Sequence, residues 1–203
     1  NDMWQADFKG HFQMQNGERC YPLNILDDCS RFCLCSDALR NETLGEVKPV
    51  FQRLFREYGL PFSLLCDNGN PWGTSQSMGY TAFEVWLMEL GVLTIHGRPL
   101  HPQTQGKDER YNRSFTRECL NVNSFLDIAD AQLKFDAYRS FYNNIRPHCA
   151  LDLNVPSAVF QKSEHPFPEK VIDWEYGPEY QRCKVSETGY FSYGGHRYFL
   201  SEG

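Results

Sequence analysis

The sequence lacks three features that would each assign it to a broad class of protein. It has no run of about 18 consecutive apolar residues, so no membrane-spanning helix is expected. None of its eight cysteines stands at Cys-x-x-Cys spacing, which argues against a zinc site, and scattered single thiols are typical of a reducing compartment such as the cytoplasm. A basic excess is missing too, because 26 Asp and Glu outnumber 20 Lys and Arg and the net charge is −6. A protein whose main task is to bind DNA is usually basic.

What is present fits one globular domain with a small appendage. The chain has 203 residues, of which 41% are hydrophobic and 15% aromatic, enough for a sizeable core. It begins at Asn1 without an initiator Met and stops at Gly203 inside a strand-rich pattern. We therefore expect it to be part of a longer protein.

The first part of the chain predicts an antiparallel meander. Strands are predicted over residues 4–8, 20–26 and 31–36, where apolar residues follow strand spacing. The Asn16-Gly17 pair is a strong hairpin signal. Asp27 and Asp28, in the turn before the third strand, are rival metal ligands, although turn chemistry explains them more simply.

Helices and buried strands are predicted to alternate after the meander. Capping-box patterns begin at Thr43 and Thr81, and the first helix carries an apolar stripe as far as Tyr58. Short apolar strands over residues 62–66 and 92–95 are of the buried, parallel kind. A further helix is predicted over residues 128–144, with an apolar face made of Ala131, Phe135, Tyr138, Phe141, Tyr142 and Ile145.

Two acids stand at the predicted strands in a way that favours chemistry. Asp7 lies in the apolar strand 4–8, and Asp67 directly follows the apolar strand 62–66. If these strands are neighbours, the two carboxylates lie about 5 Å apart and repel each other unless a cation lies between them. Taken alone, Asp67 is as well explained as the first residue of an Asp-Asn-Gly turn.

The segment from residue 101 to residue 113 reads HPQTQGKDERYNR and predicts a polar turn followed by a helix to about residue 120. The His101-Pro102 pair disfavours helix before Gln103, and Thr104 can cap the helix that follows. Glu109, Asn112 and Arg113 then share a face. This helix could be a solvated charged surface, or its cations could hold a nucleic-acid backbone while its carboxylate holds a metal.

A fourth motif is FYNNIRPHCAL over residues 141–151. Together with Asp7, Asp67 and Glu109 in their local sequences, it resembles the retroviral-integrase-type catalytic core of bacterial insertion-sequence transposases. The resemblance covers residues 1–160 well and the remainder more loosely. It implies a ribonuclease-H-like α/β fold, with a mixed five-stranded sheet flanked by helices, followed by a small all-β segment.

The resemblance also implies an activity and its residues. Asp7, Asp67 and Glu109 would bind two Mg²⁺ ions, with Mn²⁺ as a substitute, for cutting element ends and joining the 3′-hydroxyl to target DNA. The residues expected to contact DNA are Lys107, Arg110, Asn112, Arg113, Arg146 and His148. For Arg146 and His148, a structural role at the end of the helix is the favoured alternative. The family further implies a homo-oligomer, a missing N-terminal DNA-binding domain, and a location at the bacterial nucleoid.

Some observations depart from this family pattern or leave alternatives open. Asp67 and Glu109 are separated by 41 residues, 68–108, more than is usual in the family, and the Gly- and Ser-rich loop 70–79 could absorb the excess. Asp108 competes with Glu109 as the third acid, and only one of the two can face the metals. A non-catalytic module derived from such an enzyme and a nuclease that only hydrolyses are the main rivals. Hydrolase chemistry by Cys66 and His101 is a weaker one.

The last part of the chain predicts a separate small unit. Residues 161–178, with two prolines, are expected to be a linker, and residues 1–160 the core. Short strands over residues 180–186, 190–193 and 197–200 are separated by Gly-containing turns. They predict the start of a small β-barrel, truncated at residue 203.

Overall fold

The computed structural model describes residues 2–73, 79–97, 106–170, 177–181, 183–186 and 188–200. Six strands belong to the main sheet: β1 (Met3–Phe8), β2 (Phe12–Gln13), β3 (Arg19–Asp27), β4 (Cys33–Leu39), β5 (Ser63–Cys66) and β6 (Leu93–His96). The helices are α1 (Leu44–Tyr58), α2 (Ala82–Glu89), α3 (Gly106–Phe115), α4 (Ile128–Asn144) and α5 (Pro156–Val159). A π-helical turn, Thr116–Leu120, continues α3, and a 3-10 turn, Cys149–Leu151, follows α4.

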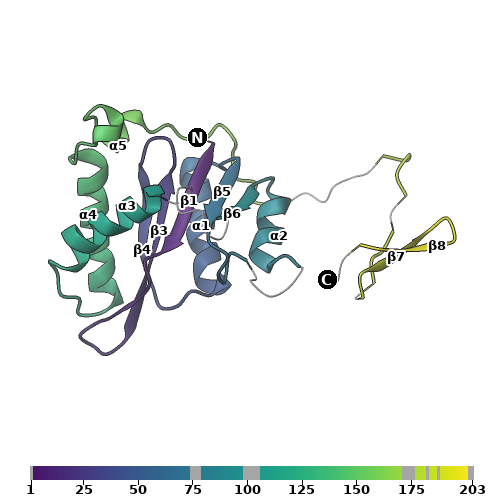
Figure 1. Ribbon diagram of the computed structural model, residues 1–203, viewed down its shortest axis with the longest axis horizontal. Helices are drawn as coiled ribbons and strands as arrows, with labels where there is room; N and C mark the ends of the chain where they lie inside the picture. The colour runs from purple at the N-terminus through teal and green to yellow at the C-terminus, as the bar shows by residue number, and fades with distance from the viewer. Residues whose placement is uncertain are drawn as a thin grey trace.

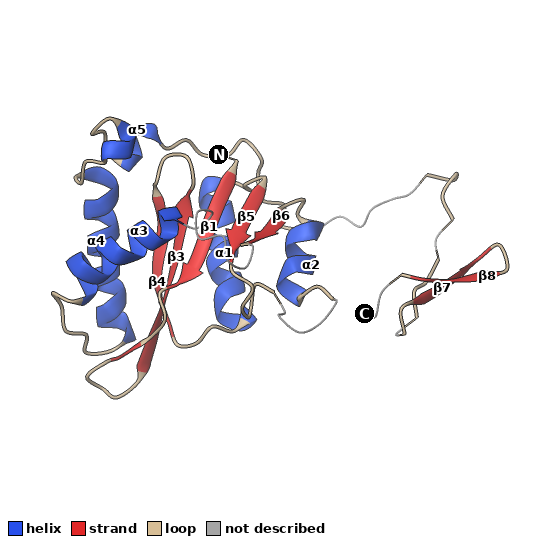
Figure 2. Ribbon diagram, in the orientation of Figure 1, coloured by secondary structure: helices blue, strands red, loops and turns tan. Residues whose placement is uncertain are grey.

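The main sheet is mixed, as predicted. β1 pairs antiparallel with β3 and parallel with β5, and β5 pairs parallel with β6. β4 lies on the other side of β3. The fold therefore contains the predicted five strands, and the two-residue β2 adds a sixth by extending the hairpin with β3. Figure 2 shows β1 near the middle of the sheet with β5 beside it.

Two apolar cores lie on the two faces of this sheet. One joins β1, β3 and β5 to α1 and α2, and it buries the whole predicted stripe of α1, Val47, Val50, Phe51, Leu54, Phe55 and Tyr58. The other packs α3, the π-helical turn and α4 against β3 and β4. Figure 1 shows α1 and the α3–α4 pair on different sides of the strands. The segment with Asp108 and Glu109 is thus held across the sheet from α1.

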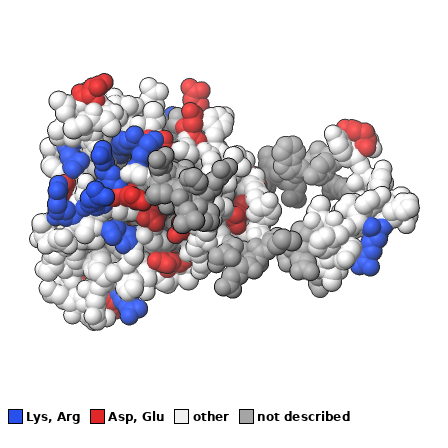
Figure 3. All heavy atoms as spheres, in the orientation of Figure 1, with Lys and Arg blue, Asp and Glu red and all other residues white. Residues whose placement is uncertain are grey.

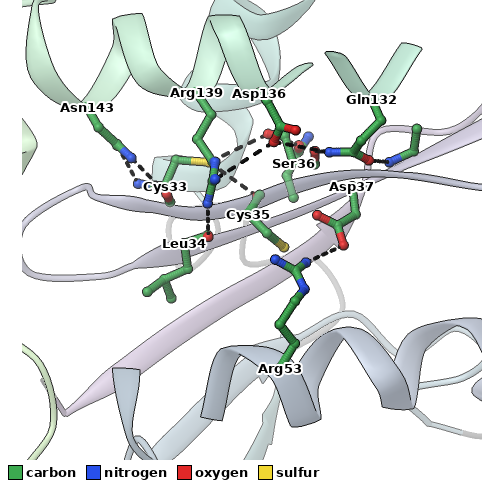
Figure 4. A network of polar contacts seen from close by, with 12 residues as sticks. Cys33, Leu34, Cys35, Ser36, Asp37, Arg53, Gln132, Asp136, Arg139 and Asn143 are labelled. Atoms are coloured by element: carbon green, nitrogen blue, oxygen red, sulfur yellow. Dashed lines mark hydrogen bonds and ion pairs between the residues drawn. The ribbon is translucent and has the colours of Figure 1, made fainter. Parts of the chain in front are cut away.

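Polar side chains of α4 cover the free edge of β4 (Figure 4). Asn143 binds both the N–H and the C=O of Cys33, at 2.8 and 2.9 Å. Arg139 donates to the Leu34 carbonyl at 2.8 Å, and Gln132 contacts the Ser36 carbonyl and the Ala38 N–H at 3.2 and 2.8 Å. These α4 residues recur at helical spacing on one face. They satisfy backbone groups that an edge strand otherwise leaves open to another chain.

Several local expectations were wrong. Phe141 and Ile145 were expected on the buried face of α4, but they are 42% and 66% exposed. The polar side chains of α4 that bind β4 take the sheet-facing position instead. The third strand begins at Cys33, since Arg31 adopts a positive φ of 64°. Thr43 makes no side-chain cap to α1. The Asn16-Gly17 hairpin is present, since β2 and β3 pair on either side of this turn and Gly17 has a positive φ of 85°.

The C-terminal part differs from the expected three strands. Among the described residues of this part, the strands are β7 (Tyr190–Tyr193) and β8 (His196–Phe199), and they pair with each other. The described residues between 180 and 186 are not a strand. The first part of the expected linker contacts the core, where Ser163 N–H donates to the Tyr58 carbonyl at 2.8 Å and Glu169 pairs with Arg56 at 2.8 Å. Within the described ranges, no helix is long and apolar enough to cross a membrane.

Candidate active site

Asp7 and Asp67 come to the same end of two adjacent parallel strands. β1 pairs with β5 in the register Met3↔Ser63, Trp4↔Leu64 and Gln5↔Leu65, and the same offset continued by two residues places Asp7 beside Asp67. Asp7 lies near the end of β1, and Asp67 is the first residue after β5. The carboxyl ends of neighbouring strands in a parallel pair are where ligands bind in open α/β sheets.

Asp7 is partly buried, and the opposing charge of Lys9 does not offset the effects that raise its pKa. Its pKa is raised to about 6, first by burial and second by the negative charge of Asp67. The Asn112 amide opposes this shift by donating a hydrogen bond from Nδ2 to Asp7 Oδ2 at 2.6 Å. Two hard-oxygen ligands that repel each other are the chemistry that a bound Mg²⁺ would satisfy.

Asp67 is exposed and is held through its backbone and one side-chain oxygen. Its Oδ1 accepts the Gly69 N–H at 2.8 Å, so the turn interpretation of this residue is correct and coexists with its place beside Asp7. Nδ1 of His96 lies 2.9 Å from the Asp67 carbonyl oxygen, and Nε2 lies 2.8 Å from Glu84 Oε1. Glu84 also completes the predicted capping box with Thr81, with bonds of 2.7 and 3.1 Å. α2 and β6 therefore both brace the loop that carries Asp67.

The two candidate third acids on α3 have opposite surroundings. Glu109 is exposed. Asp108 is only 4% exposed, and its Oδ1 has no hydrogen-bond partner within the described part of the chain. Burial, then the charges of Asp7 and Asp28, raises the pKa of Asp108 well above its ordinary value. Among the residues that the structure describes, no three His, Cys, Asp or Glu side chains already form a metal-binding cluster. Residues 101–105, which include the predicted cap Thr104, lie outside the described residues.

Asp27 and Asp28 have structural partners. Asp27 Oδ2 accepts both the N–H and the hydroxyl of Ser30, at 2.8 and 2.6 Å, which confirms its role in the turn. Asp28 binds the side chains of Gln5 and Lys107. Lys107, expected to contact DNA, is thus paired with a carboxylate at the edge of the acidic site.

A basic groove of about 750 Å³ lies along the outer face of α3. Its cations are Arg31, Lys107, Arg110, Arg113, Arg117 and Arg146. Figure 3 shows Lys and Arg gathered over α3 and the end of α4, next to carboxylates. Five of the six residues expected to contact DNA line this groove, the exception being Asn112. Arg31 was not among the expected residues, because its position in a turn far from α3 in sequence carried no signal.

The residues of the groove differ in whether other side chains already bind them. Arg110 and Arg113 are exposed, and no carboxylate of the described residues pairs with them. Arg146 instead binds both oxygens of Glu118 at 3.1 Å and contacts Ser114 at 3.3 Å. The His148 ring packs on Tyr142 with centroids 4.7 Å apart, and burial lowers the pKa of His148. These contacts agree with the structural alternative for Arg146 and His148.

Nucleophilic chemistry by Cys66 finds no support. Cys66 is buried, and burial, followed by the charges of Asp67 and Glu84, raises the pKa of its thiol far above the ordinary value. A buried apolar cysteine is inert as a nucleophile because the thiolate is the reactive form. Nδ1 of His96 lies 3.9 Å from the Cys66 sulfur, and His101 lies outside the described residues.

Comparisons with known sequences agree with this geometry. Two family models, both described as an integrase core domain, match residues 1–102 and residues 90–156. A 31.7 kDa protein of insertion element IS407 from Burkholderia multivorans is 30% identical over 80% of this chain and 56% of its own length. A 39.2 kDa protein of insertion element IS476 from Xanthomonas euvesicatoria is 29% identical over 79% of this chain and 44% of its own length. The chain thus spans about half the length of these relatives.

Solved structures show the same fold at low sequence identity. The HTLV-2 integrase catalytic core domain in complex with magnesium superposes with a TM-score of 0.56 at 17% identity, covering 78% of this chain and 95% of that one. The simian T-cell lymphotropic virus intasome covers 100% of this chain and 67% of the other, with a TM-score of 0.61 at 19% identity. The predicted ribonuclease-H-like fold is therefore confirmed.

Proposed function

We propose that this chain, which belongs to the family of integrase core domains, is the catalytic part of a metal-dependent DNA strand transferase that cuts element ends and joins a 3′-hydroxyl to target DNA. The observation that carries the proposal is the juxtaposition of Asp7 and Asp67 at the ends of adjacent parallel strands, beside a groove lined by six cations. An acidic centre next to a phosphate-binding surface is what phosphoryl transfer on DNA requires.

The acidic centre would hold Mg²⁺. Asp7, Asp67 and Glu109 would supply carboxylate oxygens, which suit this hard cation, and the mutual repulsion of Asp7 and Asp67 is relieved by a bound cation. The bound metal would supply activation of the attacking hydroxyl or water and stabilisation of the leaving oxygen. The carbonyl of Asp67 is held by His96, so the loop that presents this carboxylate is already in place.

The basic groove would position the DNA backbone. Arg110 directly follows Glu109 on α3, and Arg113 lies one turn beyond it. Both are exposed and are placed to contact phosphates on the side of α3 away from Asp108. Contacts of this kind set register without reading sequence. Lys107 and Arg146 would contribute less, since each already pairs with a carboxylate.

A strand-transfer assay tests the proposal. The substrate is a labelled branched DNA in which a free 3′-hydroxyl abuts a phosphodiester, and the metal is Mg²⁺ or Mn²⁺. We expect a joined product from the wild-type chain and a loss of more than about 1000-fold for Asp67→Asn, on the scale of removing a group that stabilises transition-state charge. Glu89→Gln, at an exposed carboxylate on α2, is the matched control and should retain activity.

The possible outcomes separate the rival functions. Cleavage without any joined product would identify a nuclease. DNA binding with neither product, in the wild type at saturating Mn²⁺, would identify a non-catalytic module. Either result would overturn the proposal.

We extend the proposal to assembly. The related HTLV-2 catalytic core is described in trimeric and dimeric forms, and two element ends must be processed together for insertion. A homo-oligomer of the full-length protein, with a further DNA-binding domain outside this chain, would meet that need. Sedimentation of the full-length protein on paired end DNA would test it, and a strictly monomeric complex would contradict it.

A further inference from the structure

A line of buried polar side chains runs from Asp7 into the interior. Asn112 Nδ2 donates to Asp7 Oδ2 at 2.6 Å, and Asn24 Nδ2 donates to Asn112 Oδ1 at 2.7 Å. The Ser36 hydroxyl is 2.7 Å from Asn24 Oδ1 and 2.6 Å from the Tyr111 hydroxyl. Cys33 Sγ lies 3.1 Å from the same Tyr111 oxygen. The line joins β1, α3, β3 and β4, and beyond Asp7 every member is nearly inaccessible to solvent.

The direction of each hydrogen bond in this line is determined from its outer end. The ionised Asp7 can only accept, so Asn112 must present its N–H₂ to Asp7 and its oxygen to Asn24. Asn24 must then donate to Asn112, which turns its own oxygen toward Ser36. The Ser36 hydrogen is used on Asn24, so the Tyr111 hydroxyl must donate to Ser36. Each amide therefore has one orientation that satisfies both of its neighbours in the line.

The inner end of the line is anchored. Asn143 of α4 binds both the N–H and the C=O of Cys33, and Gln132 binds the Ser36 carbonyl at 3.2 Å. Figure 4 shows these contacts around Cys33 and Ser36. Apolar residues would fill this interior without the desolvation cost of polar groups. A fully bonded polar line in such a place imposes a single arrangement on its members.

We propose that Asn24, Ser36 and Tyr111 are positioning residues, which act through Asn112 to orient the Asp7 carboxylate. By fixing the Asn112 N–H₂ toward Asp7 Oδ2, they set the rotamer of the Asp7 carboxylate, which lies close enough to Asp67 to feel its charge. The arrangement can be tested in the metal-free protein. Its consequence for metal binding and strand transfer rests on the proposed function.

The chain offers a matched pair of variants. Tyr111→Phe removes the hydroxyl that donates to Ser36. Tyr138→Phe removes a hydroxyl from the same aromatic cluster, 6.1 Å away between ring centroids, and the Tyr138 hydroxyl is buried without a hydrogen-bond partner in the described residues. Both variants delete one oxygen atom from a buried tyrosine of the same core, so a general packing effect should appear in both. Ser36→Ala removes the next member of the line, and Ser36→Thr, which keeps the hydroxyl, should restore its function.

The first readout is independent of catalysis. In the metal-free protein, the side-chain N–H₂ of Asn112 should give one pair of proton signals with slow hydrogen exchange. Tyr111→Phe and Ser36→Ala should shift these signals and accelerate their exchange by about tenfold, the factor that corresponds to losing one net hydrogen bond of about 1.4 kcal/mol. Tyr138→Phe and Ser36→Thr should leave them unchanged. If Tyr111→Phe leaves the Asn112 signals and their exchange as in the wild type, the positioning proposal is wrong, whatever the activity of the protein.

The second readout is the Mg²⁺ dependence of strand transfer. Loss of a residue that orients a metal ligand typically reduces metal affinity about 10- to 100-fold. Tyr111→Phe should therefore raise the Mg²⁺ concentration for half-maximal activity by about tenfold, with most of the maximal rate recovered at high Mg²⁺. An unchanged Mg²⁺ dependence together with a shifted Asn112 signal would also overturn the functional consequence. If the wild type shows no strand transfer, the proposed function fails while the NMR test still decides the positioning role.

Discussion

The two faces of helix α3 differ in burial and in hydrogen bonding. The inner face carries Asp108, Tyr111 and Asn112, which are buried, and Asn112 donates a hydrogen bond directly to Asp7. The outer face carries Arg110 and Arg113, which are exposed and have no carboxylate partner among the described residues. The inner face is organised before any ligand binds, whereas the outer face is left solvated.

This difference follows from what each face would do. A carboxylate that holds a metal must keep its position to within a fraction of an ångström, so it benefits from buried, bonded support. A cation that attracts DNA acts over a Debye length of about 8–10 Å, so it gains little from a fixed geometry. Changes to Tyr111 and Asn112, which support Asp7 from the inner face, should therefore affect chemistry and leave DNA binding intact, and changes to Arg110 and Arg113 on the outer face should do the reverse.

The largest expected effect separates the two acids at the start of α3. Glu109→Gln should reduce strand transfer by more than about 1000-fold, because Glu109 is exposed at the start of α3 and matches the family pattern. Asp108→Asn should retain much of the activity and raise the stability of the metal-free protein, since Asp108 is buried and its pKa is raised well above the ordinary value by burial and by Asp7. Strand-transfer rates and thermal unfolding of both variants would measure this.

The reverse pattern, an inactive Asp108→Asn and an active Glu109→Gln, would make Asp108 the third ligand. The inner face of α3 would then carry the chemistry alone.

The next effect concerns DNA affinity. Replacing both Arg110 and Arg113 by Ala should weaken binding to a random-sequence duplex by about tenfold at physiological salt and reduce the slope of log K against log salt by about 2, close to 1 for each lost phosphate contact. Fluorescence anisotropy over a salt series would measure it. Arg40→Ala, which removes an exposed cation outside the groove, is the control. An equal loss in that control would mean that the groove has no special role.

A smaller effect links Mg²⁺, pH and stability. The folded-state pKa of Asp7 is about 6 against an ordinary 3.8, because of burial and then Asp67. The proton on Asp7 therefore favours the folded protein most at low pH, and this contribution is lost as pH rises through 6. Mg²⁺ competes with that proton, so 10 mM Mg²⁺ should raise Tm by about 3 °C at pH 7.5 and by much less at pH 5.

Scanning calorimetry of the wild type and Asp7→Asn would test this dependence. Asp7→Asn should be more stable than the wild type at pH 7.5 without metal and should respond little to Mg²⁺. A full Mg²⁺ response in the variant would show that the metal binds elsewhere.

The smallest effect concerns Arg146, which lines the groove and is also paired with a carboxylate. Because that carboxylate is Glu118, Arg146→Ala should lower the free energy of unfolding by about 1 kcal/mol and change the salt slope of DNA binding only slightly. Glu118→Gln should lower stability by a similar amount and release Arg146 toward the groove. A salt slope that falls by a full unit in Arg146→Ala would class Arg146 with Arg110 and Arg113.

Much of this molecule could be predicted from local pattern. The apolar stripe of α1, the bounds of α4 and the strands that carry Asp7 and Asp67 follow from periodicity, which depends only on neighbours in sequence. The motif around Glu109 and the run that ends at Leu151 carried the family resemblance. The mixed sheet followed from the order of these elements.

Contacts between distant segments had no such signal. Asn24, Ser36 and Tyr111 look like ordinary strand and helix residues until folding brings β3, β4 and α3 together around Asn112. For the same reason, the sequence alone placed Phe141 on the buried face of α4, although Arg139 and Asn143 take that position to satisfy the edge of β4. The sequence by itself determined most of the helices and strands of the core and where the acids stand along them. Only the tertiary structure decided which polar groups meet. A buried hydrogen bond can depend on a partner far away in sequence, as Cys33 and Asn143 show with a separation of 110 residues. The free-energy cost of leaving such a buried group unpaired selects the final arrangement.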